Sequence, residues 1–314
     1  MKIALIGTGL MGRPMGERVL AAGYHLTVFN RSPEKAELLR SSGAEIAATA
    51  GAAIHSAECV ILMLANGAAI REVLFSSEPA PDLRDRTVIQ MGTISPADSV
   101  ALEKEVLGRG GEYLEAPVLG SIPEASAGKL LIMVGASEPQ FDEWSPLLEC
   151  FGSEPLLIGE VGKAAAVKLA LNQLIASLTV GFASSLGFVQ SLGIEVELFM
   201  KILRKSALHA PIFDKKLTFM LDRDYGIGNF PSKHLLKDVA LFRAAAETVN
   251  LETIGIEAIH RLLEITLEKG YADGDYSALF EAVSPLRQQA ASSSQIFTMQ
   301  CIITTASCPL SAAC

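Results

Sequence analysis

The chain carries a glycine-rich hexamer whose residue types and spacing suit phosphate binding. Gly7-Thr8-Gly9-Leu10-Met11-Gly12 follows a short apolar run and precedes a stretch expected to be helical. In such a turn the first glycine permits a tight bend, the second lets the backbone approach a pyrophosphate, and the third lets helix and strand pack closely. The helix expected after Gly9 would direct free N–H groups and its positive dipole end at the phosphates. The hexamer predicts a dinucleotide site; the alternative is a glycine-rich turn without a ligand.

A second apolar run ends in Asn30-Arg31-Ser32, where a site for NAD usually places an acidic residue that accepts from the ribose hydroxyls. An acid would repel a 2′-phosphate, whereas Arg31 attracts it and Ser32 can donate a hydrogen bond to it. The turn therefore favours NADP (NADPH) over NAD. The alternative is that Arg31 is a solvated turn residue.

Lys168 and Asn172 lie four residues apart in a predicted helix, and so on one face of it. A lysine among apolar residues is a candidate for partial desolvation, which lowers its pKa toward neutrality. Such a lysine can give a proton to a carbonyl oxygen as hydride reaches the carbon. Asn172 could orient the same oxygen or hold the lysine. The alternative is a solvated lysine near a helix start.

Alternating strands and helices are expected to position these side chains. Short apolar runs are typical of buried parallel strands, and Ser32-Pro33 has the pattern of a helix start. The expected strands cover 2–7, 25–30, 59–64 and 87–89, and the expected helices 10–22 and 33–42. This alternation indicates βαβ units and an α/β fold with a mostly parallel sheet.

Long helical stretches replace the strands after about residue 160, at 162–192, 195–205, 232–248 and 254–268. We expect an NADP-binding domain over 1–161, an all-helical substrate and oligomerisation domain over 162–287, and a peripheral tail over 288–314. A helix of about 30 residues spans roughly 45 Å, so it would bridge the domains or contact another subunit. The stretch 169–194 has no charged residue, but its polar side chains fit a buried helix in a soluble assembly better than a membrane span.

Composition excludes several classes of protein. The 314 residues are 50% hydrophobic, which supplies a sizeable core and excludes a disordered chain. Lys and Arg total 26 against 35 Asp and Glu, and this net charge of −9 argues against nucleic-acid binding. The five cysteines form no CxxC pair, so we predict neither a disulfide framework nor a metal site, and we expect a cytoplasmic setting.

Several segments together resemble the β-hydroxyacid dehydrogenase (3-hydroxyisobutyrate dehydrogenase-like) family, in order and spacing over roughly residues 1–285. Asn30-Arg31-Ser32 and the segment 230–238 are most similar to the glyoxylate/succinic semialdehyde reductase branch. The segments that carry the family resemblance are Gly7–Met15, Met91–Pro96, Glu115–Ser121, Lys168 with Asn172, and Lys237-Asp238.

The resemblance implies a Rossmann domain followed by an all-α domain similar to that of 6-phosphogluconate dehydrogenase, built on a long interdomain helix. It also implies homodimers or homotetramers, and NADPH-dependent reduction of small aldehyde acids to hydroxy acids. By position, Lys168 becomes the proton donor and Asn172 its neighbour at the substrate, while Phe230 and Asp238 close the substrate side.

On the cofactor side, the resemblance places Thr93 by the nicotinamide ribose and Lys237 within reach of the cofactor. Without the resemblance, Lys237-Asp238 could equally be an exposed ion pair. The residues that would line the cofactor after the fourth strand are Met63, Leu64, Ala65 and Asn66.

One departure bears on the substrate. The family usually has a serine where this chain has Leu119, and that hydroxyl helps to hold the substrate carboxylate. A leucine cannot donate, so the backbone N–H groups near Gly120 and Ser121, or the Ser121 hydroxyl, would have to serve.

The first hypothesis is therefore an NADPH-dependent reductase of glyoxylate or succinic semialdehyde, with Lys168 as general acid. The same site could run in reverse as a 3-hydroxyacid dehydrogenase, or accept a ketone or an imine. The alternative class is a dinucleotide-binding protein without catalysis, which Leu119 favours and the retained Lys168, Asn172 and Asp238 oppose.

Overall fold

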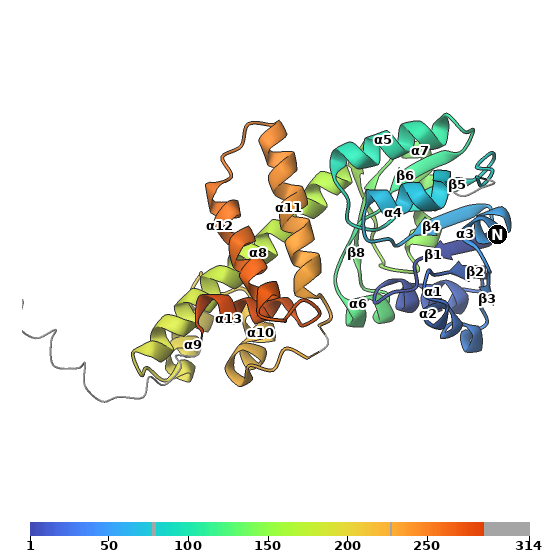
Figure 1. Ribbon diagram of the computed structural model, residues 1–314. Coiled ribbons are helices and arrows are strands. Elements are labelled where there is room, and N and C mark those ends of the chain that lie inside the picture. The colour runs from blue at the N-terminus through green and yellow to red at the C-terminus, as the bar shows by residue number, and fades with distance from the viewer. Residues whose placement is uncertain (77–79, 227, 286–314) are drawn as a thin grey trace, which may run out of the picture. The chain divides into compact units, whose positions relative to one another are not determined.

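The computed structural model describes residues 1–76, 80–226 and 228–285. Residues Met1–Ser284 form one compact unit. The tail expected over 288–314 lies outside the described residues, as do the three cysteines in it. The unit contains a sheet with its covering helices, called here the sheet lobe, and the helices from residue 163 onward, called the helical lobe (Figure 1).

The expected strands are confirmed, and they form a mostly parallel sheet. The strand order is β3-β2-β1-β4-β5-β6-β8-β7, with β9 paired to β8. Pairing is parallel from β3 through β6, and β8 runs antiparallel to both β6 and β7. The bounds are β1 Lys2–Ile6, β2 His25–Phe29, β3 Glu45–Ile46, β4 Cys59–Leu62, β5 Thr87–Gln90, β6 Glu112–Glu115, β7 Val118–Leu119, β8 Leu131–Gly135 and β9 Leu156–Gly159.

Successive residues of a strand point to opposite faces, and both faces of this sheet are covered. In β1, Ile3 and Leu5 join a core with Met15 and Trp144, whereas Ala4 and Ile6 join a separate core with Leu102. The covering helices are α1 Gly12–Ala21, α2 Pro33–Glu37, α3 Ala50–His55, α4 Gly67–Arg71, α5 Pro96–Leu107, α6 Ile122–Ala127 and α7 Glu138–Leu148. The uninterrupted apolar runs in the sequence follow from this burial on both sides.

The helix expected over 33–42 is shorter than predicted. Regular α-helix ends at Glu37, and a 3-10 turn follows over Arg40–Ser42. Gly43 then takes a left-handed conformation with φ 103°, which ends the segment as a glycine typically does.

The helical lobe is built around one long helix, as the sequence predicts. Helix α8 covers Lys163–Ser191 and contacts α10, α11, α12 and α13, and Figure 1 shows α11 and α12 beside it. By length and composition alone α8 could cross a membrane, but its buried face packs into the lobe's apolar core as a core helix does. The other helices are α9 Val196–Lys205, α10 Pro211–Asp222, α11 Ser232–Thr248, α12 Ile254–Glu268 and α13 Phe280–Val283.

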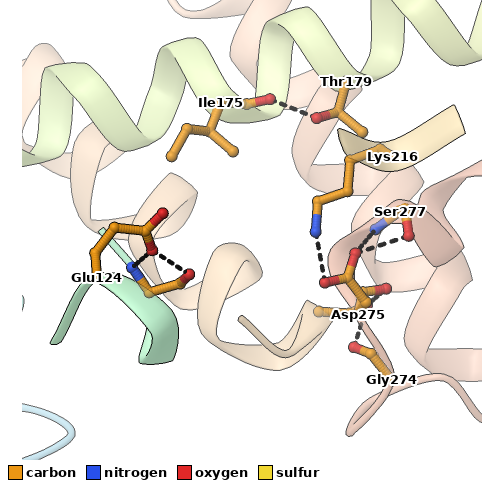
Figure 2. Close-up of polar contacts among 9 residues, drawn as sticks. Glu124, Ile175, Thr179, Lys216, Gly274, Asp275 and Ser277 are labelled. Carbon is orange, nitrogen blue, oxygen red and sulfur yellow. Dashed lines mark hydrogen bonds and ion pairs between the residues drawn. The ribbon is translucent and has the colours of Figure 1, made fainter. Parts of the chain in front are cut away.

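A buried ion pair ties α10 to the segment that leads into α13. Lys216 Nζ lies 2.7 Å from Asp275 Oδ2, and the other carboxylate oxygen accepts from the Ser277 backbone N–H (Figure 2). The Lys216 ammonium also lies 4.4 Å from the ring centroid of Tyr276. The carboxylate and the ring offset the desolvation cost of a charged lysine that is largely withdrawn from solvent.

Candidate active site

The predicted phosphate turn lies where the order of the sheet changes direction. Strand β1 has β2 on one side and β4 on the other, so ligands are expected at the carboxyl ends of β1 and β4. Gly7 follows β1 directly, and Met63 follows β4. The turn therefore opens into the crevice that a parallel sheet of this kind provides.

The geometry explains why each of these three positions is a glycine. Gly7 has φ 100°, and a Cβ there would lie 2.4 Å from the Met63 carbonyl oxygen. A Cβ on Gly12 would lie 1.9 Å from the Gly7 carbonyl oxygen, so only glycine lets α1 pack this closely. Gly9 has open space where a Cβ would lie, and this space leaves room for a pyrophosphate. The regular helix begins at Gly12, although its first bond already runs from Arg13 N–H to the Gly9 carbonyl oxygen at 3.1 Å.

The side chain of Asn30 joins the two turns predicted to bind the cofactor. Its Oδ1 accepts from the Thr8 backbone N–H at 3.0 Å, and its Nδ2 donates to the Ser32 carbonyl oxygen at 3.0 Å. Asn30 thus fixes the position of exposed Arg31 relative to the glycine turn. The buried Thr8 hydroxyl has no hydrogen-bond partner among the described residues, so a polar group remains to be satisfied at this turn.

A cavity of about 1370 Å³ runs along these elements and reaches the helical lobe. Its wall includes the predicted cofactor residues with the exception of Thr8. Phe230 and Asp238 also border it. The bordering predicted residues are Gly7, Gly9, Leu10, Met11, Gly12, Asn30, Arg31, Ser32, Met63, Leu64, Ala65, Asn66, Thr93, Lys237, Phe230 and Asp238. A cavity of this volume, lined by the glycine turn, by basic Arg31 after β2 and by residues of the helical lobe, fits a dinucleotide.

Some bordering residues were missed by sequence reasoning. Lys35, His55 and Lys233 line the cavity, and so does His234, which the sequence places beside Lys237-Asp238 without a role. Burial is the main reason that the pKa of His234 lies below its usual value. Lys35 lies on α2 four residues after Arg31, but Arg31 precedes this helix, so helical spacing could not have found Lys35.

Lys168 and Asn172 are buried together on α8 and connect to Asp238 on α11. Lys168 is 8% exposed and Asn172 1%. Lys168 Nζ donates to Asn172 Oδ1 at 2.8 Å, and Asn172 Nδ2 donates to Asp238 Oδ2 at 2.6 Å. The two bonds fix the Asn172 amide, because its oxygen faces an ammonium and its nitrogen a carboxylate. Lys168 and Asn172 do not border the cavity; Asp238 does, so the chain of bonds reaches the cavity there.

Burial lowers the pKa of Lys168 to about 8, partly opposed by the Asp238 carboxylate and reinforced by the Lys237 ammonium. A group with this pKa is charged at neutral pH and still able to release its proton, as a general acid requires. The solvated-lysine alternative is therefore wrong for Lys168.

Lys237 holds the two lobes together at the wall of the cavity. Its ammonium donates to the carbonyl oxygens of Ala65 at 2.8 Å and Thr93 at 2.7 Å, and lies 3.1 Å from Asp238 Oδ1. The pair Lys237-Asp238 is therefore not an exposed ion pair. It joins α11 to the carboxyl ends of β4 and β5.

The segment expected to bind a substrate carboxylate is already bonded to a carboxylate of the chain. The Ser121 backbone N–H and hydroxyl both donate to Glu124 Oε2, at 2.9 and 2.6 Å, in a capping box at the start of α6 (Figure 2). These bonds from Ser121 lower the pKa of Glu124 to about 2. Leu119, Gly120 and Ser121 do not border the cavity. An incoming carboxylate would have to displace Glu124 from Ser121 or bind elsewhere.

His209, a residue the sequence leaves ambiguous, lies away from the cavity. Its Nε2 is 2.7 Å from Asp214 Oδ2, and its ring packs edge-on against Phe213. Across residues 1–76, 80–226 and 228–285, no group of three or more His, Cys, Asp and Glu side chains is arranged to hold a metal.

Comparisons with known proteins agree with this geometry. A family profile described as the NAD binding domain of 6-phosphogluconate dehydrogenase matches residues 2–162, and one described as NAD-binding of NADP-dependent 3-hydroxyisobutyrate dehydrogenase matches residues 162–283. The chain belongs to the β-hydroxyacid dehydrogenase family. It is thus an oxidoreductase with an NAD(P)-binding Rossmann domain followed by a helical domain.

Individual relatives cover nearly the whole chain. Glyoxylate/succinic semialdehyde reductase 2 of Arabidopsis thaliana is 28% identical over 93% of this chain and 82% of its own. An uncharacterized oxidoreductase of Bacillus subtilis, YfjR, is 34% identical over 90% of this chain and 100% of its own. Among solved structures, 3-hydroxyisobutyrate dehydrogenase of Mycobacterium tuberculosis has the same fold, with a TM-score of 0.81 at 23% identity over 90% of this chain and 98% of its own.

Proposed function

We propose that this family member is an NADPH-dependent reductase of small aldehyde acids such as glyoxylate or succinic semialdehyde, with Lys168 as general acid. The observation that carries the proposal is the buried Lys168, bonded through Asn172 to Asp238 at the cavity wall. When bound, the reduced nicotinamide supplies the hydride. The carbonyl oxygen would bind beside Asp238, where the bonded set of Lys168, Asn172 and Asp238 meets the cavity. The Lys168 ammonium would exchange its bond to Asn172 for one to this oxygen and give it the proton, and Asp238 stabilises the charged form beforehand.

NADPH is preferred over NADH in this proposal because of Arg31 and Ser32. Both border the cavity at the end of β2, where Arg31 can pair with a 2′-phosphate and Ser32 can donate to it. The similarity to glyoxylate/succinic semialdehyde reductases 1 and 2 of Arabidopsis thaliana supports the substrate class.

A substrate screen tests the proposal. NADPH and NADH oxidation are followed with glyoxylate, succinic semialdehyde and the neutral aldehyde butanal. We expect kcat/KM to be highest for an aldehyde acid with NADPH. Tight binding of NADPH without turnover of any carbonyl compound would instead support a non-catalytic dinucleotide-binding protein.

One observation favours a second candidate, a reductase of carbonyl compounds that lack a carboxylate. The Leu119 side chain supplies no donor, and the backbone N–H and hydroxyl of Ser121 are both bonded to Glu124. A negative charge at this position would repel a second carboxylate. A higher kcat/KM for butanal than for succinic semialdehyde, reversed in the double variant Leu119→Ser with Glu124→Gln, would select this candidate.

A further inference from the structure

Glu115 is a buried carboxylate that connects the sheet to the start of α8. It ends β6 and is 1% exposed. Its Oε1 accepts from the backbone N–H groups of Gly162 at 2.8 Å and Ala165 at 3.0 Å. The first N–H groups of a helix have no partner within the helix, and negative charge near them is stabilising. Gly162, the residue before α8, has no side chain that could cap the helix. Glu115, on a strand distant in the sequence, caps it instead.

The residues around Glu115 bond to its carboxylate and leave space for it. The Ser99 hydroxyl donates to Glu115 Oε2, and the Tyr113 hydroxyl lies 2.9 Å from the Ser99 oxygen. Because the Ser99 hydrogen is directed to Glu115, Tyr113 is the donor to Ser99. On another side, a Cβ on Gly135 would lie 2.5 Å from Glu115 Oε1, so glycine at 135 makes the space that the carboxylate fills.

The anchored amide lies one helical turn before the proposed acid. Ala165 and Lys168 are three residues apart on α8, hence neighbours along one side of the helix. Strand β6 pairs with β5, whose end leads to Thr93 at the cavity wall. Glu115 therefore links the edge of the sheet that borders the cavity to the turn of α8 that carries Lys168.

We propose that Glu115 is a positioning residue, which sets where α8 begins on the sheet and thereby where the Lys168 ammonium lies. The claim rests on the proposed role of Lys168. A misplacement of about 1 Å at a reacting group can reduce a rate about 100-fold, so loss of this anchor is expected to act on the chemical step.

The test compares Glu115→Ala, Ser99→Ala and Gly135→Ala with Glu103→Gln, a control that removes a nearby charge but no bond to α8. The measurements are the single-turnover rate of NADPH oxidation, the Kd of NADPH, and the pKa of Lys168 from NMR of protein labelled with 13C in lysine. For Glu115→Ala we expect a rate about 100-fold lower, an unchanged Kd, and a Lys168 pKa that moves up from about 8 as water reaches the loosened turn. Glu103→Gln should match the wild type in each measurement.

Ser99→Ala and Gly135→Ala keep the test decisive if Glu115→Ala does not fold. Each disturbs the position of the Glu115 carboxylate without removing it. Each should therefore lower the rate and raise the Lys168 pKa, as Glu115→Ala does, but by a smaller amount. Folded variants with the wild-type rate and an unchanged Lys168 pKa would overturn the proposal. If the wild type reduces no carbonyl compound, the proposed function fails, but an unmoved Lys168 pKa in these variants would still decide against Glu115.

Discussion

The chemistry proposed for Lys168 depends on its neighbours as much as on the lysine. Burial alone would favour the neutral amine, and the Asp238 carboxylate opposes this by stabilising the ammonium. Asn172 lies between them and bonds to both. The sequence predicts the Lys168–Asn172 pair from its i, i+4 spacing. It could not predict Glu115 as a partner of α8, because those bonds join segments that lie far apart in the sequence. The Ser121–Glu124 bonds are local, and their Ser-x-x-Glu spacing is the pattern of a capping box.

Replacing Asp238 by Asn is expected to move the alkaline limit of the reductase rate to lower pH. Without the carboxylate charge the ammonium is less stable, so the pKa of Lys168 falls below about 8, by roughly one unit. The pH dependence of kcat measures this shift. Asp222→Asn, at the exposed end of α10, is the control and should leave the profile in place. A shift to higher pH would contradict the assigned charge interaction.

Replacing Arg31 by Ala is expected to weaken NADPH binding about tenfold or more and to leave NADH binding unchanged, because a hydrogen bond to a charged group contributes about 1.5–3 kcal/mol. Fluorescence titration with each cofactor measures this. Arg40→Ala removes a neighbouring exposed arginine that does not border the large cavity, and should change neither Kd. If Arg31→Ala lost affinity for NADPH and NADH equally, Arg31 would not recognise the 2′-phosphate.

At the scale of elements, the sequence predicts those helices and strands that have a clear local pattern of apolar residues. The apolar runs of β1, β2, β4 and β5 and the long helices α8, α9, α11 and α12 were all expected within a few residues. Helix α10 was not, because its start has only Pro211 as a signal and the left-handed residue that follows its last turn is Arg223, with φ 52°, and not a glycine. The antiparallel pair β7–β8 was also missed, since β7 has two residues and forms only through its partner.

The glycine turn allows cofactor binding to be separated from folding. Gly9→Ala should leave the unfolding midpoint nearly unchanged, because a Cβ there meets no atom within 4 Å. It should nevertheless weaken NADPH binding about tenfold or more, since the backbone must approach the pyrophosphate closely. Thermal unfolding measures the midpoint, and titration with NADPH measures the affinity. Gly181→Ala, also in open space but on α8, should keep NADPH binding and stabilise the fold by about 0.5–1 kcal/mol. Wild-type NADPH affinity in Gly9→Ala would count against the phosphate site.

At the scale of the whole molecule, the sequence predicts the α/β fold and the change to helices, but the assembly of the site depends on contacts between lobes. Lys237 reaches Ala65 and Thr93 across more than a hundred residues of sequence. The surface also carries large apolar side chains near α9, with Ile202 72% and Leu208 78% exposed. Large exposed apolar patches mark interaction surfaces, so these side chains are where we look for a contact of the homo-oligomer that the family resemblance implies.

We propose that exposed Ile202 lies at an interface of the expected homo-oligomer. Ile202→Glu would then shift the protein toward monomer, because a charge at an apolar interface is buried without a partner. Light scattering after size-exclusion chromatography measures the mass. Lys201→Glu, next to it on α9, changes charge without removing apolar surface and should leave the mass unchanged. A wild-type protein that is monomeric at micromolar concentration would contradict the predicted assembly.

The pH dependence of the single-turnover rate of NADPH oxidation tests the role of Lys168 most directly. With the best aldehyde substrate, the wild-type rate should be constant below and fall above a pKa of about 8, as Lys168 loses the proton it must give. Lys168→Met should lower the rate at pH 7 about 100-fold or more and abolish this fall, whereas Lys163→Met, at the exposed start of α8, should behave as wild type. A Lys168→Met enzyme with the wild-type rate, or a wild-type rate that rises through the same pH range, would contradict the assignment of Lys168 as the acid.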